Sequence, residues 1–107
     1  NPYIGFTAMA TEANHIREEE NIHHYYYYKF RGGENMDVYL HEEATKISTE
    51  DSLFNIYRKG DCMIFVKEKN VMRSPLSNWI QQTHHEKIGN FYLIHPTLNT
   101  SSLYNQP

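Results

Sequence analysis

Residues 48–66, STEDSLFNIYRKGDCMIFV, combine the clearest helix signal of the chain with its most apolar run. Ser48 can act as an N-cap, two acidic residues fall in the first turn, and Gly60 is typical of a helix end. The apolar positions between them follow the helical spacing i, i+3, i+4: Leu53, Ile56 and Tyr57. The pattern therefore predicts a helix over 49–59, followed by a central strand over 62–66 that is covered on both faces.

Upstream of this stretch the composition predicts one helix and one hairpin. Residues 8–20 carry a narrow apolar stripe at helical spacing. Residues 22–31 contain four consecutive tyrosines, which favour a strand. A turn signal at 32–35 separates them from residues 36–41, where apolar and polar side chains alternate. The two segments are expected to pair as an antiparallel hairpin.

Downstream, the pattern predicts two strands and a short helix. Residues 71–73 are read as a short strand, and Ser74 followed by Pro75 marks the start of a helix. Residues 84–86 are read as a linker, and residues 87–95 as a single last strand. We predict an α+β domain over 1–96, with a single mixed or antiparallel sheet and two or three short helices packed on one face. A polar C-terminal tail follows over 97–107. The expected core includes Leu53, Ile56, Met63, Ile64, Phe65, Trp79 and Leu93.

Composition and motifs exclude several classes of protein. The 107 residues carry a net charge of −3 and no stripe of lysine and arginine, which argues against binding nucleic acid. No apolar run approaches the roughly 18 residues that a membrane span needs. The one cysteine, Cys62, excludes an internal disulfide, and its apolar neighbours predict a buried, inert thiol. No phosphate-binding loop or nucleophile motif is present, and no cofactor is expected.

The tyrosine run is the leading candidate for a binding surface. Side chains alternate along a strand, so the run places two rings on each face of the sheet. If helices cover one face, the other presents a pair of rings beside basic and histidine side chains. The alternative is that all four rings pack within the protein. The candidate binding residues are Tyr25, Tyr26, Tyr27, Tyr28, Lys29 and Tyr39.

Two adjacent histidine pairs offer an alternative chemistry. Neighbouring residues on a strand point to opposite faces, so each pair can supply one ligand to a given metal site. A site would combine one histidine from each pair with Glu86 or His41, although no established zinc-binding spacing is present. The alternative metal-ligating or catalytic residues are His23, His24, His84, His85 and Glu86.

The sequence therefore favours a non-enzymatic binding or sensory module that recognises a protein partner or a small apolar ligand through the tyrosine-rich hairpin. The chain begins with Asn1-Pro2 rather than Met, from which we expect an excised, extracytoplasmic part of a membrane-anchored regulator. We also expect a hetero-oligomer, since a small aromatic-rich domain can be incomplete without another subunit. Two alternatives stay open. One is a small histidine-dependent or metal-assisted hydrolase or nuclease, and the other is a viral or toxin-neutralising inhibitor.

Overall fold

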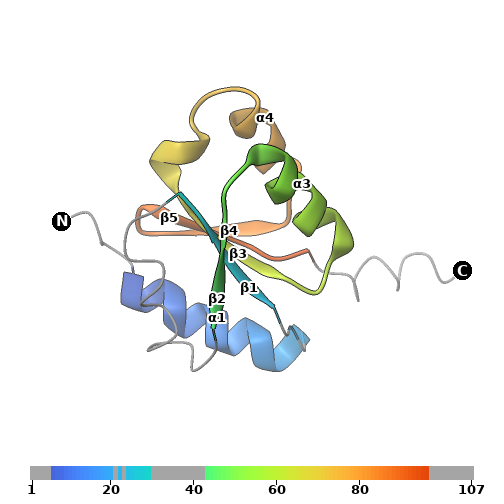
Figure 1. The fold of residues 1–107 in the computed structure, drawn as a ribbon. Helices are drawn as coiled ribbons and strands as arrows, with labels where there is room; N and C mark the ends of the chain where they lie inside the picture. The colour runs from blue at the N-terminus through green and yellow to red at the C-terminus, as the bar shows by residue number, and fades with distance from the viewer. Residues whose placement is uncertain (1–5, 21, 23, 30–42, 97–107) are drawn as a thin grey trace, which may run out of the picture.

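A single mixed sheet of five strands organises the chain, and helices cover it (Figure 1). The computed structural model describes residues 6–20, 22, 24–29 and 43–96. In chain order the elements are α1 (Phe6–Glu20), β1 (Tyr25–Tyr28), β2 (Ala44–Ile47), α3 (Glu50–Lys59), β3 (Met63–Lys67), η2 (Glu68–Val71), α4 (Leu76–Ile80), β4 (His85–Ile88) and β5 (Phe91–Ile94). The sheet order is β2-β1-β3-β5-β4. These features confirm the predicted α+β class with one mixed sheet.

Strand β3 lies at the centre of the sheet, as its apolar sequence predicts. It pairs in parallel with β1 and antiparallel with β5, and all of its residues are buried. When helices cover both faces of a sheet, neither face of a central strand meets solvent, so its side chains need not alternate between apolar and polar. This explains the uninterrupted apolar run. Helix α3 makes the connection from β2 to β3, and this crossover allows the two strands to be parallel.

Helices cover both faces of the sheet, which corrects the expectation of helices on one face. Helix α1 packs on the face formed by alternate strand residues such as Tyr25, Phe65 and Leu93. Helices α3 and α4 cover the opposite face, where Ile64 and Ile94 are buried. Figure 1 shows α1 below the sheet and the two shorter helices above it. The odd and even positions of one strand therefore belong to two separate apolar clusters.

The ends of α3 follow the predicted chemistry, with one change of residue. The N-cap is Thr49 rather than Ser48, and its hydroxyl oxygen accepts a hydrogen bond from the Ser52 backbone N–H at 3.1 Å. Gly60 ends the helix with φ of 79°, and its N–H donates to the Tyr57 carbonyl. A positive φ favours glycine, which explains why this position stops the helix.

The predicted tyrosine hairpin is wrong in its pairing. Residues 36–41 lie outside the described residues, but both edges of β1 are occupied by the parallel strands β2 and β3. Among the described residues of the predicted strand over 22–31, those in the strand are 25–28. The local turn signal could not reveal this, because parallel pairing depends on residues that lie further along the chain.

Three further segments differ from the sequence interpretation. Residues 71–73 do not form a strand, since Glu68–Val71 is a short 3₁₀ helix. Residues 84–86 are not a linker, and residues 87–95 are not one strand, because β4 and β5 form an antiparallel hairpin. Gly89, with φ of 62°, supplies the turn between them. The N-cap of α4 is Pro75 rather than Ser74. The predicted tail over 97–107 lies outside the described residues.

Candidate functional site

The tyrosine run is packed inside the protein rather than displayed on a surface. Tyr25 and Tyr27 lie under α1 and Tyr28 lies under the helices of the opposite face, each with at most 8% of its surface exposed. Tyr26 is half-buried against the second cluster. The expectation of an exposed ring pair fails for three of the four tyrosines, because the sheet is covered on both faces.

The two other predicted binding residues, Lys29 and Tyr39, do not restore an exposed tyrosine surface. Lys29 is exposed with φ of 50°, and its ammonium lies 5.4 Å from the centre of the Tyr28 ring. The Asn70 side-chain amide donates a hydrogen bond of 2.6 Å to the Lys29 carbonyl, which ties the residue after β1 to η2. Tyr39 lies outside the described residues.

Cys62 lies in the apolar cluster beneath α3, where its thiol contacts the carbonyl oxygen of Ile56 at 3.5 Å. Burial, together with the nearby Asp61 carboxylate, raises the pKa of the Cys62 thiol to about 12. Burial also raises the pKa of Tyr26, with smaller contributions from Cys62 and Asp61. A thiol with so high a pKa is protonated at neutral pH and is a poor nucleophile, in line with the inert thiol that the sequence predicts.

We expect the free energy of unfolding to fall by about 1 kcal/mol between about pH 8.5 and pH 10 because of Cys62. The unfolded thiol titrates near pH 9 and the folded one near 12, so the unfolded state loses its proton first as the pH rises. The contribution of Cys62 to stability is therefore fully present below pH 9 and is lost as the pH rises above it. Urea titrations of the wild type and of Cys62→Ala at both pH values measure this difference. Equal declines in the two proteins would contradict the prediction.

An open groove of about 470 Å³ lies between α3 and α4. Its lining residues come from these helices and the residues that flank α4: Phe54, Tyr57, Arg58, Pro75, Asn78, Trp79 and Gln82. On α3, Leu53 points into the core and Phe54 lies beside it on the helix surface, with Tyr57 and Arg58, three and four residues after Phe54, on the same side. On α4, Leu76 and Ile80 are buried, which leaves Trp79 at the groove.

Three aromatic rings form the wall of this groove. The Phe54 and Trp79 ring centres are 5.2 Å apart with the planes tilted by 56°, and Tyr57 meets Trp79 edge-on at 5.6 Å. These are the arrangements that aromatic pairs prefer. The Tyr57 hydroxyl also accepts a hydrogen bond of 2.9 Å from the backbone N–H of His84. Each ring is half-buried, so the rings are held in position while part of each faces solvent.

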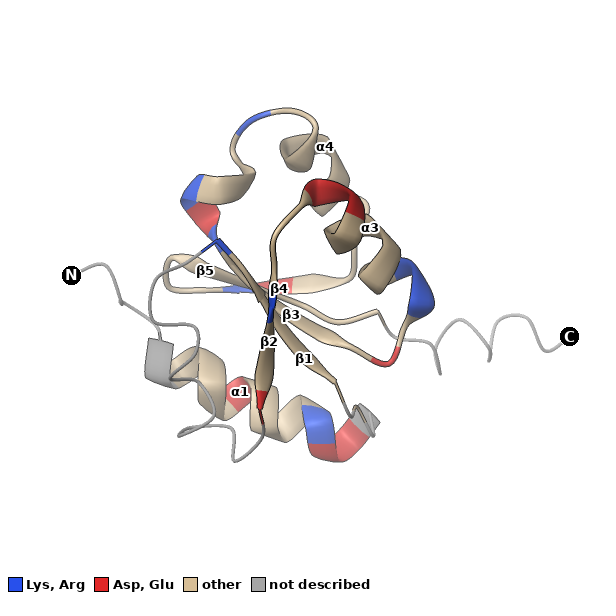
Figure 2. Cartoon of the chain, in the orientation of Figure 1, with Lys and Arg blue, Asp and Glu red and all other residues tan. Residues whose placement is uncertain are grey.

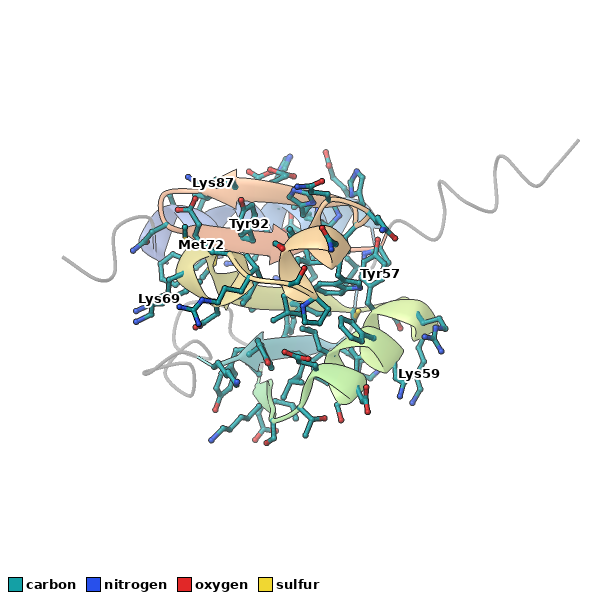
Figure 3. The ribbon with its side chains drawn as sticks, turned by 90° about the horizontal axis from the view of Figure 1, so that it is seen from above. Tyr57, Lys59, Lys69, Met72, Lys87 and Tyr92 are labelled. Carbon is teal, nitrogen blue, oxygen red and sulfur yellow. The ribbon has the colours of Figure 1, made fainter. Side chains whose placement is uncertain are left out.

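The polar edge of the groove carries positive charge. Among the described residues of the lining, the charged one is Arg58, and Lys59 follows it at the end of α3. Figure 2 shows the basic residues at the C-terminal end of α3 and the acidic ones at its N-terminal end. In Figure 3, Tyr57 lies between the two helices and Lys59 lies at the outer end of α3. Asn78 and Gln82 are exposed and add amide groups.

A second, smaller cavity of about 220 Å³ lies near the opposite ends of the strands. It is lined by Lys67, Glu68, Lys69, Met72 and Asn90. Met72 is 69% exposed, and the Lys87 ammonium lies 3.6 Å from the Glu68 carboxylate. Figure 3 places Met72, Lys69, Tyr92 and Lys87 away from Tyr57. This surface therefore offers positions for control substitutions.

The described histidines of the two predicted pairs do not come together in one place. His23 lies outside the described residues, and the imidazole of His24 is exposed, 3.9 Å from the Asp61 carboxylate. The imidazole Nδ1 of His85 contacts the Thr83 hydroxyl at 3.0 Å and lies on the α4 side of the sheet. Two strands separate β1 from β4, so the described His24 lies apart from His84 and His85 across the sheet.

His84 instead lies beside His95, a residue that the sequence interpretation missed. Their Nδ1 atoms are 3.2 Å apart, and the His95 Nε2 lies 3.4 Å from a carboxylate oxygen of Glu86. The pairing of His84 with His95 could be found only by recognising the β4–β5 hairpin. Within the part of the chain that the structure describes, no group of three or more histidine, cysteine or acidic residues could hold a metal ion.

No protein family model matches this chain, and no curated protein or solved structure shows significant similarity to it. Among the described residues, none of the helices has the length and apolar character needed to cross a membrane.

Proposed function

We propose that this protein is a non-enzymatic binding module that recognises a short peptide segment of a partner protein in the groove between α3 and α4. The observation that carries the proposal is the set of three half-exposed rings at Phe54, Tyr57 and Trp79, fixed by their mutual contacts. Rigid aromatic side chains supply large contact area at a low cost in conformational entropy, and they are enriched among the residues that dominate binding energy. The groove replaces the tyrosine run as the binding site.

The shape of the groove favours a peptide over a small apolar ligand. Small-molecule sites enclose most of their ligand, whereas this groove is open along the two helices. Aromatic-lined grooves of this kind accept extended segments, whose apolar side chains pack between the rings. The buried thiol of Cys62, with its pKa near 12, offers no reactive group at neutral pH that would favour covalent catalysis.

The charge at the groove defines the partner more closely. Arg58 lines the groove, Lys59 follows it, and the lining that the structure describes contains no acidic residue. An acidic side chain on the peptide would meet the Arg58 guanidinium in the two-pronged geometry that arginine and carboxylate groups favour. We therefore propose a peptide that carries a proline or aromatic residue next to an aspartate or glutamate.

The single tryptophan of the chain makes the groove directly observable, because Trp79 lies in its wall. A display library of random peptides selected on the folded protein should yield sequences with an acidic residue beside a proline or aromatic residue. Titration of the selected peptides should change the fluorescence emission of Trp79. Selection of no peptide, or of peptides that leave this emission unchanged, would overturn the proposal.

Phe54→Ala is expected to weaken binding of the selected peptides by about tenfold or more, because it removes one ring of the wall. Arg58→Glu should weaken the acidic peptides similarly, and their binding should fall as salt rises. Met72→Ala, an exposed substitution outside the groove, is the control and should bind like the wild type. Isothermal titration calorimetry measures the affinities, and circular dichroism checks the fold. Equal affinity of Phe54→Ala and Met72→Ala would contradict the prediction.

A further inference from the structure

The open end of the β4–β5 hairpin brings two imidazoles together on the α1 side of the sheet. The His95 backbone N–H donates to the His84 carbonyl at 3.0 Å, which extends the strand ladder by one pair beyond His85 and Ile94. Directly opposed residues on an antiparallel pair point to the same face. The two rings meet edge-on with centres 4.4 Å apart, and their Nδ1 atoms are 3.2 Å apart.

We propose that His84 and His95 bind a divalent transition-metal ion of the zinc class through their Nδ1 atoms. Zinc binds imidazole nitrogen at about 2.0–2.1 Å in a tetrahedral arrangement, so two nitrogens on one ion lie about 3.3–3.4 Å apart. The observed separation of 3.2 Å is close to this value. The hairpin therefore holds both donor atoms near the spacing that the metal requires.

Glu86 supplies the supporting carboxylate that metal-binding histidines commonly have. Its Oε2 lies 3.4 Å from His95 Nε2, a contact longer than a direct hydrogen bond of about 2.7–3.2 Å but within ion-pair range. A carboxylate at Nε2 favours the tautomer with the proton on that nitrogen, which leaves the Nδ1 lone pair facing His84. The His95 side chain is 4% exposed, so the surrounding protein restricts its orientation.

His84 gives the ion access from solvent. Its side chain is exposed, and its Nδ1 also lies 3.2 Å from the His95 carbonyl oxygen. In the metal-free protein this nitrogen can donate to either acceptor, and a shift of its proton to Nε2 frees it for the metal without a change of charge. With two protein ligands, the remaining positions of the ion are open to water, so binding is weaker than at a closed four-ligand zinc site.

Zinc titration of the folded wild-type chain tests this site directly. Calorimetry should show saturable binding of one Zn²⁺ per chain, and NMR spectra of the histidine ring nitrogens should show shifts at His84 and His95. Mg²⁺, which prefers oxygen ligands, should cause neither effect. Absence of saturable binding at millimolar zinc, or shifts confined to other histidines such as His15 or His24, would overturn the proposal.

His84→Ala should weaken zinc binding by at least about tenfold, and Glu86→Gln by about tenfold while both ligands remain. His24→Ala removes another exposed histidine, on the other side of the central strands, and should bind zinc like the wild type. Equal zinc affinity of His84→Ala and His24→Ala would contradict the assignment. The ring-nitrogen shifts of the wild type decide the question if His84→Ala does not fold. The groove rings are not ligands, so a failure of peptide selection leaves the zinc prediction standing, although the two regions share the hydrogen bond from the His84 backbone N–H to the Tyr57 hydroxyl.

Discussion

Phe65→Ala is expected to lower the free energy of unfolding by about 3–5 kcal/mol. Phe65 is fully buried at the middle of β3, and its ring stacks on Tyr25 with centres 6.4 Å apart. Its neighbours in the sheet are Tyr27 and Leu93, and α1 covers it. Alanine at this position removes the ring and leaves a cavity that the strands on either side cannot close.

The loss can be measured by equilibrium unfolding in urea or guanidinium, with Met72→Ala as the matched control. Met72 is 69% exposed, so its truncation should change stability by no more than about 0.5 kcal/mol. Native domains are stable by about 5–15 kcal/mol, so Phe65→Ala removes a large fraction of the total. A loss below about 1 kcal/mol would show that Phe65 is not enclosed by α1 and the sheet.

The sequence predicts β3 and α3 well because their signals are local. The uninterrupted apolar run from Cys62 to Val66 has no polar alternate, and this pattern is sufficient for a strand covered on both faces. The helix over 49–59 has an acidic first turn, a basic last turn and Gly60 at its end. Five of the expected core residues are fully buried, whereas Ile56 and Trp79 are only partly buried.

The errors concern information that is not local. The parallel pairing of β1 with β2 and β3 depends on segments far apart in the chain. The local pattern of the tyrosine run instead predicts a hairpin with one face of the sheet open to solvent. Gly89-Asn90 is a recognisable two-residue hairpin turn, but the apolar pattern of 87–95 concealed it. Recognising that turn would have placed His84 opposite His95.

The groove could be only partly predicted. Helical spacing places Phe54 one position away from the buried Leu53, and an apolar residue beside the main stripe is a signal for a second contact surface. Trp79 was assigned to the core because its spacing with Leu76 and Ile80 suits a buried face. Phe54 and Tyr57 contact Trp79 because the two helices lie close together in the tertiary structure. The spacing of apolar residues within each helix does not predict this proximity.

Leu53→Ala is expected to lower the free energy of unfolding by about 2–5 kcal/mol. Leu53 is fully buried and anchors α3 on the face of the sheet opposite to Phe65, in the cluster that also contains Ile64 and Ile94. Phe54→Ala, at the next position, is the matched control. Phe54 is half-buried in the groove wall, so its truncation removes less buried area and should cost less than Leu53→Ala.

Combining Leu53→Ala with Phe65→Ala tests the arrangement of the two apolar clusters. The two residues belong to separate clusters on opposite faces, so their effects should add to within about 0.5 kcal/mol. The sum, about 5–10 kcal/mol, is comparable to the whole stability of a domain, and the double variant should be largely unfolded without a stabilising cosolvent. Measurement in sucrose or trimethylamine oxide restores a folded baseline for the comparison. A combined loss much smaller than the sum would mean that both side chains contribute to one shared cluster, and helices on both faces of the sheet would then be ruled out.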